Sequence, residues 1–204
     1  MKLHPTQDSR LSRPKFSRVN RSQRKGFTLV ELLVVLAIIA TLASISYGAI
    51  TRYLENGRKS ESHLLAQTAV KACEDFKEEY GYYPKSLSPT ADKFFALDSA
   101  EQKFILILTG EEDEFNTNQR RFLDVNKAKK NQINGMKVDA SDVPVALVDS
   151  WGNPIYLAID YDFKPDGMKL EGIDENVQAS VVGVSAGADG ELGTEDDVRT
   201  WEKP

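Results

Sequence analysis

The hydrophobic and polar positions of this 204-residue chain predict a long helix first and strands later. After Glu31 no charged residue occurs until Arg52, and residues 32–51 include ten leucine, isoleucine or valine residues. Twenty helical residues rise about 30 Å, the thickness of a hydrocarbon core. Ten such side chains favour insertion by about 3 to 6 kcal/mol, whereas a carboxylate costs less near an end than at mid-membrane. We therefore predict a transmembrane helix with Glu31 near its start.

The helical pattern continues beyond the apolar run, to about Tyr80. Apolar side chains recur every three or four residues on one face, whereas charged residues occupy the other face; the apolar positions are Leu54, Leu65, Ala69, Cys73, Phe76 and Tyr80. Gly81 and Pro84 are expected to end the helix, and Asn56-Gly57 is its expected weak point. We expect Cys73 to be a small buried hydrophobe. We expect His63, on a mixed face, to be solvated.

Residues 85–142 have the least regular pattern. Ser99-Ala100-Glu101-Gln102 has the form of a capping box, and the apolar spacing from Phe104 to Gly110 predicts a short helix. Charges of alternating sign between residues 111 and 130 predict a solvated loop.

From Val143 onward the pattern is typical of strands. Five short β-rich runs are separated by turn residues; the runs are 145–148, 155–159, 168–170, 179–184 and 198–201. The main turns are expected at 149–154 and 164–167. We predict an α+β fold in which an antiparallel sheet of three to five strands packs on the long helix.

Charge is distributed very unevenly along the chain. Residues 1–26 carry eight basic residues and one acidic residue, a net charge of +7, and short basic flanks stay in the cytoplasm. The part after Thr51 is therefore expected outside the cytoplasm. The remaining 178 residues carry a net charge of −12, which argues against nucleic acid as a partner. A single cysteine excludes an intrachain disulfide, and two histidines are too few to suggest histidine-based catalysis or a zinc site.

The segment Lys25-Gly26-Phe27-Thr28-Leu29-Val30-Glu31 resembles the processing site of type IV pilin-like proteins, or pseudopilins. The resemblance implies that a membrane-embedded prepilin peptidase cuts between Gly26 and Phe27 and methylates the new Phe27 amine. It also implies that Glu31 meets the Phe27 amine of a neighbouring subunit, which would neutralise a carboxylate in lipid. The alternative is that Glu31 only reaches to the membrane interface. Gly48 stands where many family members have proline.

Residues 185–197 concentrate oxygen ligands in a glycine-rich loop. Calcium takes six to eight oxygens in flexible geometry, although an acidic loop alone is usually only solvated. The loop resembles the calcium loop of the major (G-type) pseudopilin of type II secretion systems, which implies Ca²⁺ ligands at matching positions. These are the side chains of Asp189, Asp196 and Asp197 and the carbonyls of Ala186 and Glu191. Glu195 departs from the family pattern and is a further candidate ligand.

Two other stretches resemble the same pseudopilin: Tyr80-Gly81-Tyr82-Tyr83-Pro84 after the long helix, and the Asp-x-Trp-Gly-Asn-Pro hexapeptide at 149–154. Gly183-Val184-Ser185-Ala186-Gly187 matches the nucleophile elbow of hydrolases. That motif needs a following helix and a later histidine, and no histidine follows His63. Asp160 and Asp162 are expected to be turn residues rather than an acid/base pair. We therefore expect that the protein is not an enzyme.

The resemblance implies a structural pseudopilin that waits in the inner membrane with its N-terminus cytoplasmic. It would polymerise with other pseudopilins, on an inner-membrane assembly platform, into a periplasmic helical fibre that drives type II protein secretion. The alternatives are a type IV pilin or minor pilin for adhesion or DNA uptake, and a membrane-tethered calcium-binding module. The expected organisation is a leader at 1–26, a membrane and assembly half-helix at 27–51, an amphipathic half-helix at 52–84, a variable insertion at 85–142, and the sheet with the acidic loop at 143–204.

Overall fold

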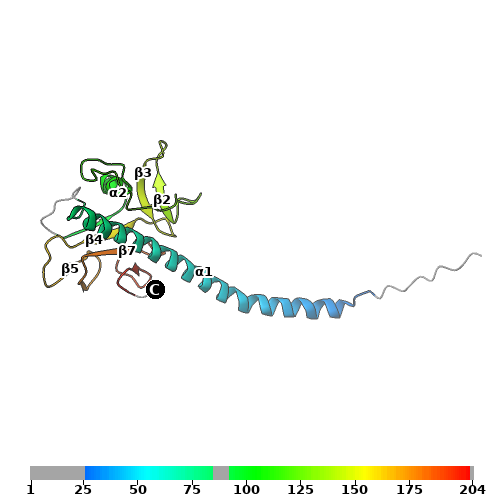
Figure 1. The fold of residues 1–204 in the computed structure, drawn as a ribbon. Coiled ribbons are helices and arrows are strands. Elements are labelled where there is room, and N and C mark those ends of the chain that lie inside the picture. The colour runs from blue at the N-terminus through cyan, green and yellow to red at the C-terminus, as the bar shows by residue number, and fades with distance from the viewer. Residues whose placement is uncertain (1–25, 85–91, 203–204) are drawn as a thin grey trace, which may run out of the picture. The chain divides into compact units, whose positions relative to one another are not determined.

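The structure is a computed structural model that describes residues 26–84 and 92–202. The described residues up to Ser46 belong to one compact unit and those from Tyr47 onward to a second. The helix α1 (Leu29–Tyr80) begins two residues after the expected start and ends at Tyr80, as predicted (Figure 1). Gly81 ends it with a φ of 77°, and its N–H donates to the Lys77 carbonyl over 2.8 Å. Contrary to the prediction of a weak point, α1 has no break at Asn56-Gly57.

The final turns of α1 contribute one face to the main hydrophobic core of the second unit. Cys73 and Phe76 are fully buried, which confirms the predicted stripe there, and burial raises the pKa of the Cys73 thiol. Two expectations are wrong. Leu54 is exposed, because the buried part of the helix begins only at Ser62. His63 is buried rather than solvated.

The main sheet has four antiparallel strands in the order β1-β4-β7-β8. Their bounds are β1 (Lys93–Ala96), β4 (Ile155–Ile159), β7 (Val181–Ser185) and β8 (Val198–Arg199). Two smaller antiparallel pairs accompany the sheet. They are β2 (Gly135–Val138) with β3 (Pro144–Val148), and β5 (Met168–Lys169) with β6 (Asn176–Val177). The second unit is thus α+β, as predicted.

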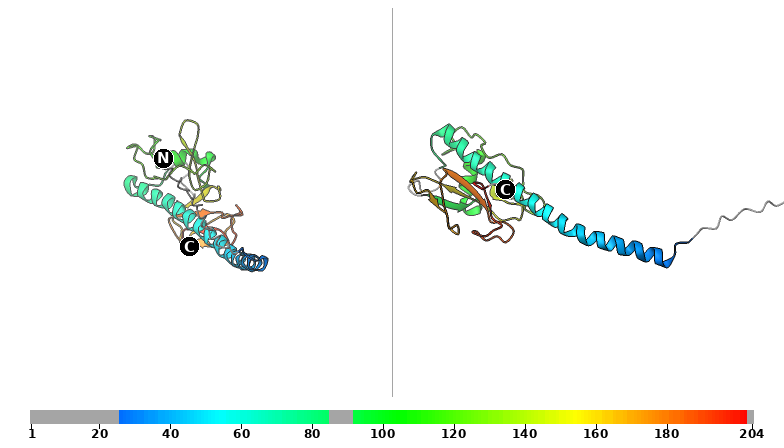
Figure 2. Two further views of the ribbon diagram at one scale, coloured as in Figure 1. Left: turned by 90° about the vertical axis from the view of Figure 1, so that its right-hand side faces the viewer. Right: turned by 90° about the horizontal axis from the view of Figure 1, so that it is seen from below.

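Both faces of the sheet are covered, as the alternation along β4 shows. Ile155, Leu157 and Ile159 belong to the core that contains the buried face of α1, whereas Ala158 belongs to a second cluster with residues of β5 to β7. Figure 2 shows the orange strand β7 beside the second half of α1. At their contact Gly183 has no room for a side chain, because an added Cβ would lie 3.1 Å from the carbonyl oxygen of Ala66. Glycine therefore allows the helix and the sheet to approach closely.

The region 92–142 is more ordered than the sequence pattern predicts. β1 joins the main sheet, and α2 (Gln102–Thr109) is preceded by a 3-10 helix at Ser99–Glu101. The predicted capping box is wrong by one residue, because Asp98 is the cap and accepts the Ala100 N–H over 2.8 Å. The charged clusters at 111–114 and 127–130 are mostly exposed, as predicted, but the chain between them is not all solvated. Asn116 and Leu123 are buried there, and the Asn116 amide donates to carbonyls of Ile107 and Arg120.

Candidate functional site

The start of α1 has a reciprocal capping arrangement between Thr28 and Glu31. The Thr28 hydroxyl accepts the Glu31 N–H over 3.2 Å, while the Glu31 carboxylate accepts the Thr28 N–H over 2.8 Å. The Thr28 hydroxyl also donates to that same carboxylate oxygen over 2.8 Å. This is a capping box, which satisfies N–H groups that a helix start leaves unpaired. The spacing Thr-x-x-Glu is its signal in the sequence, although we did not predict a capping box at this position.

The capping box fixes where the Glu31 carboxylate lies within one chain. It is folded back toward the residues that precede the helix, on the side of Phe27, whose own side chain is 84% exposed. Gly26 and Phe27 themselves lie outside any helix. The two residues of the predicted cleavage site are thus accessible, and the predicted assembly carboxylate is held at the head of α1.

The first half of α1 presents apolar side chains that nothing in the described chain covers. Leu, Ile and Val side chains between Leu29 and Ile50 are 45–80% exposed. By length and composition α1 can cross a membrane, and its most apolar window is not buried at all within the protein. A continuous apolar surface of this kind needs lipid or another protein chain around it.

At the other end of the chain, Asp149 organises the hexapeptide turn between β3 and β4. Its Oδ1 accepts the N–H groups of Trp151, Gly152 and Asn153 over 2.8–2.9 Å. Asp149 is fully buried, and this burial raises the pKa of its carboxyl above the ordinary value, partly offset by the hydrogen bonds it accepts. The structure confirms the turn predicted at 149–154 and gives Asp149 a structural role in it.

The same turn also fastens the C-terminal loop at its base. The Ser185 hydroxyl donates to Asp149 Oδ2 over 2.6 Å, and the Asn153 amide donates to the Gly187 carbonyl over 2.8 Å. Ser185 is the serine of the apparent nucleophile elbow. A turn follows it in the structure, so the helix that this motif requires is missing from the described residues 186–202.

Two aspartates shape the C-terminal loop from within. Asp196 accepts the N–H groups of Ala188 and Asp189 on one oxygen and the Thr194 hydroxyl, at 2.6 Å, on the other. The Thr194 bond is the main reason that the pKa of Asp196 lies below its ordinary value. Asp197 Oδ2 accepts the Gly193 N–H over 2.9 Å and faces Arg199 at 3.3 Å. Asp197 Oδ1 is buried and has no hydrogen-bond partner among the described residues.

The predicted calcium ligands share this loop, but the structure does not gather their carboxylates at one point. Asp189 Oδ1 accepts the Glu191 N–H, and the carbonyls of Ala186 and Glu191 accept bonds from Gly190 and Thr194. The donor chemistry fits a hard cation, and Asp197 Oδ1 is available. An ion would have to displace some of the internal hydrogen bonds.

A different acidic group does converge within the described residues. Carboxylate oxygens of Asp92, Asp160 and Asp162 lie within 4.8 Å of one another. Partial burial raises the pKa of Asp92, whereas the Lys164 hydrogen bond lowers that of Asp162. Asp160 and Asp162 accept backbone N–H groups of Phe163 and Lys164, which confirms that they are turn residues. The sequence gives no signal for Asp92, because it reaches the turn only through the pairing of β1 with β4.

Comparisons with known proteins agree with the features at the start of α1. Residues 21–47 match the prokaryotic N-terminal methylation motif. The chain is 37% identical over 62 residues to the type IV major pilin protein PilE of Neisseria gonorrhoeae, covering 30% of this chain and 37% of that pilin. It is 35% identical over 63 residues to a fimbrial protein of Neisseria meningitidis serogroup A, covering 31% of this chain and 37% of that protein.

A third relative, the fimbrial protein EcpC of Eikenella corrodens, is 38% identical over 61 residues, which cover 30% of this chain and 40% of EcpC. The chain thus spans well under half the length of the curated relatives it matches. No solved structure gives a significant match. The chain carries the N-terminal methylation motif of type IV pilin-like proteins and is homologous to type IV major pilins over this stretch.

Proposed function

We propose that this protein is a subunit of a type IV pilin-like fibre and is anchored in the inner membrane by α1 before it assembles. The observation that carries the proposal is the juxtaposition at the head of α1. A methylation motif spans residues 21–47, and within it a carboxylate, Glu31, opens an apolar helix surface that is exposed along its length. Such a helix is stable in lipid as a monomer, or in a fibre where it packs against the same helix of other copies.

The chemistry expected of the chain itself is limited to assembly. Prepilin peptidase would cut after Gly26 and methylate the amine of Phe27, and that cationic amine would approach Glu31 of a neighbouring copy. A carboxylate in an apolar surround is costly unless a cation pairs with it. Formation of the pair therefore selects copies whose helices are in the correct register, and the apolar surfaces of α1 then supply the bulk of the stabilisation. We assign the protein no catalytic role.

The comparisons support a type IV pilin better than our initial interpretation of a type II secretion pseudopilin. The relatives are named as major pilins and fimbrial proteins. The pseudopilin remains a second candidate, because the hexapeptide at 149–154 and the acidic loop resemble those of the major pseudopilin. The two candidates differ in where the fibre accumulates. Shearing of intact cells and electron microscopy of the released material should recover long filaments of this protein; fibres confined to the periplasm would instead support the pseudopilin.

We also propose that the acidic loop binds Ca²⁺ through Asp189, Asp196 and Asp197, with Glu195 as a further ligand. Clustered carboxylates repel one another until a cation neutralises them. At calcium about a hundredfold above its Kd, binding adds about 2.7 kcal/mol, or about 5–10 °C in Tm for a chain of this size. Chelation with EDTA should remove this increase from the full chain in detergent.

The matched control for the calcium site is Asp174→Ala, which removes an exposed carboxylate outside the loop. Asp189→Ala should abolish the response of the Tm to calcium, while Asp174→Ala should retain it. An equal Tm with calcium and with EDTA in the unsubstituted protein would count against the site.

A further inference from the structure

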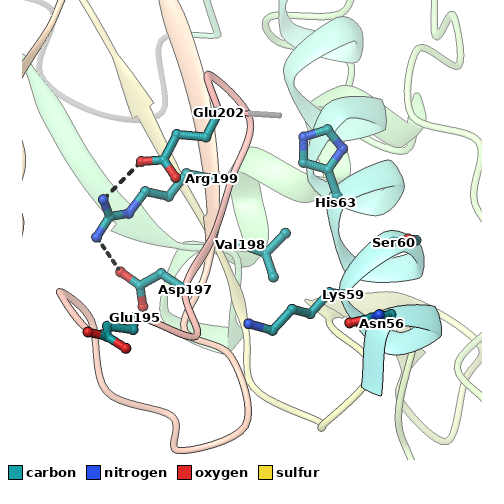
Figure 3. Close-up of a pocket in the computed structure, with 9 residues that line it drawn as sticks. All are labelled: Asn56, Lys59, Ser60, His63, Glu195, Asp197, Val198, Arg199 and Glu202. Atoms are coloured by element: carbon teal, nitrogen blue, oxygen red, sulfur yellow. Dashed lines mark hydrogen bonds and ion pairs between the residues drawn. The ribbon is translucent and has the colours of Figure 1, made fainter. Parts of the chain in front are cut away.

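A pocket of about 470 Å³ lies between α1 and the C-terminal loop (Figure 3). Asn56, Lys59 and His63 line it from the helix, and Glu195, Asp197 and Glu202 line it from the loop. All of these residues belong to the second unit. In Figure 3 the Lys59 side chain extends from the helix toward the loop that carries Glu195 and Asp197.

Three buried polar atoms of residues that line this pocket lack hydrogen-bond partners in the described part of the chain. They are Nε2 of His63, a residue that is 7% exposed, Oδ1 of Asp197, whose side chain is 1% exposed, and Nε of Arg199. Leaving a buried acceptor unsatisfied is costly, the more so when it belongs to a charged group. Asp197 Oδ1 can only accept a hydrogen bond when the carboxylate is ionised. At Asp197 the pocket therefore fits a ligand that donates N–H groups, whereas the Nε–H of Arg199 is itself a donor that needs an acceptor.

The loop side of the pocket also has an excess of negative charge. Residues 189–202 include six acidic residues and one basic residue, a net charge of −5. That basic residue, Arg199, is already engaged by Glu175, Asp197 and Glu202. Glu195 is exposed and makes no ion pair with any described residue. Lys59, across the pocket, forms no ion pair within the described ranges either, so the charge on Glu195 has no compensating partner among these residues.

Two basic side chains lie on α1 beside the pocket: Arg52 precedes it, and Arg58 stands between the lining residues Asn56 and Lys59. Arg52 and Arg58 are both exposed, and within the described residues neither forms an ion pair. Several other basic residues of this unit are engaged within the chain, for example Lys71 with Asp75 and Arg120 with Glu79. A guanidinium carries five N–H donors in a planar fork that matches carboxylates, which a single ammonium does not.

We propose that the pocket between α1 and the C-terminal loop receives the Arg52/Arg58 segment of a second copy of this chain, whose guanidinium groups pair with Glu195 and Asp197. This inference rests on the proposed function, because a fibre brings many copies together. A contact between these two surfaces can repeat from copy to copy in an open helical array, which a fibre requires. Within one chain both surfaces keep their unpaired charges. Assembly removes both deficits at once in copies whose loop holds no Ca²⁺, because Glu195 and Asp197 are also proposed calcium ligands.

Crosslinking between two differently tagged variants tests the contact. One copy carries Arg52→Cys or Arg58→Cys and the other carries Glu195→Cys; the native Cys73 is buried and should not react. A short bis-maleimide should link the two tags when both variants are assembled in one fibre. Lys169→Cys replaces an exposed basic residue outside the Arg52/Arg58 segment. It is the control partner for Glu195→Cys and should give at least tenfold less product. Fibres in which neither arginine position yields more product than Lys169→Cys would overturn the contact.

Charge reversal provides a second test that does not depend on cysteine reactivity. Arg52→Glu/Arg58→Glu and Glu195→Arg should each reduce the fibre yield at least tenfold, and expression of the two variants together should restore part of it. Full yields for each variant alone would overturn the docking proposal but not the proposed role as a fibre subunit. If the unsubstituted chain forms no fibre, the proposed function itself is wrong. If calcium, rather than a second copy, is what the loop requires, Glu195→Arg alone will fail and the arginine variants will assemble normally.

Discussion

Replacement of Glu31 by glutamine is expected to abolish fibre assembly without changing the residue at which α1 begins. Glutamine serves at this position of a capping box as glutamate does, so the bonds with Thr28 can form. Only the charge is lost. Breaking a buried pair by removing one partner costs about 3–5 kcal/mol, because the other charge is left uncompensated. Each subunit contact should therefore weaken more than a hundredfold, and the yield of sheared filaments measures this loss.

Thr28→Val is the matched control for the assembly carboxylate. It removes the hydroxyl that Glu31 and Thr28 share but retains the charge of Glu31. Loss of a cap costs about 1 kcal/mol of local helix stability, so fibres should still form in this variant. Filaments at normal yield from Glu31→Gln would show that the carboxylate does not hold copies together.

Replacement of Asp149 by alanine should unfold a large part of the second unit, whereas asparagine should be tolerated. Alanine leaves three backbone N–H groups and the Ser185 hydroxyl without their acceptor. We expect a loss of about 3 kcal/mol or more in the free energy of unfolding. In asparagine the Oδ1 can accept the same three N–H groups and the amide can donate to Ser185, so we expect a change within about 1 kcal/mol. Denaturant unfolding of the two variants in detergent distinguishes these outcomes.

The effect of pH on Asp149 has a definite sign. Burial raises the pKa of this carboxyl in the folded state, so the folded state binds the proton more tightly than the unfolded state. The wild-type protein should therefore lose stability relative to Asp149→Asn as pH rises from below the ordinary aspartate pKa through the raised pKa. The free energy of unfolding of the wild type minus that of Asp149→Asn should therefore increase as the pH is lowered. A decrease in acid would show that the hydrogen bonds outweigh burial.

The sequence predicts those elements whose cause is local. The span of α1 follows from its apolar period and from Gly81, and β4 follows from an apolar run between two turns. By contrast β6 has two residues, and β1 is stabilised through its pairing with β4, far along the chain. His63 is buried because the C-terminal loop lies across its face of α1 (Figure 3). The spacing of apolar residues along the helix does not indicate this contact.

The candidate functional residues also divide into those that a local stretch of sequence indicates and those that only the folded chain brings together. Gly26, Phe27 and Glu31 are recognisable from one contiguous stretch, and the capping box of Glu31 is also encoded there. The link from Asp149 to Ser185 joins two distant motifs through the strand pairing of β4 with β7, so each motif was recognised but their connection was not. Asp197 is a predicted Ca²⁺ ligand by resemblance. Its unpartnered oxygen is visible only when the loop is folded.

Processing at the head of α1 is tested most directly by the mass and N-terminal sequence of the mature protein, purified from cells that contain its own export machinery. A chain that begins at methylated Phe27 is the predicted result, and it would show that the membrane helix is prepared for assembly through its amine. An intact leader, or a chain that begins after Ala43, would contradict this and would indicate a tethered or secreted module instead of a fibre subunit.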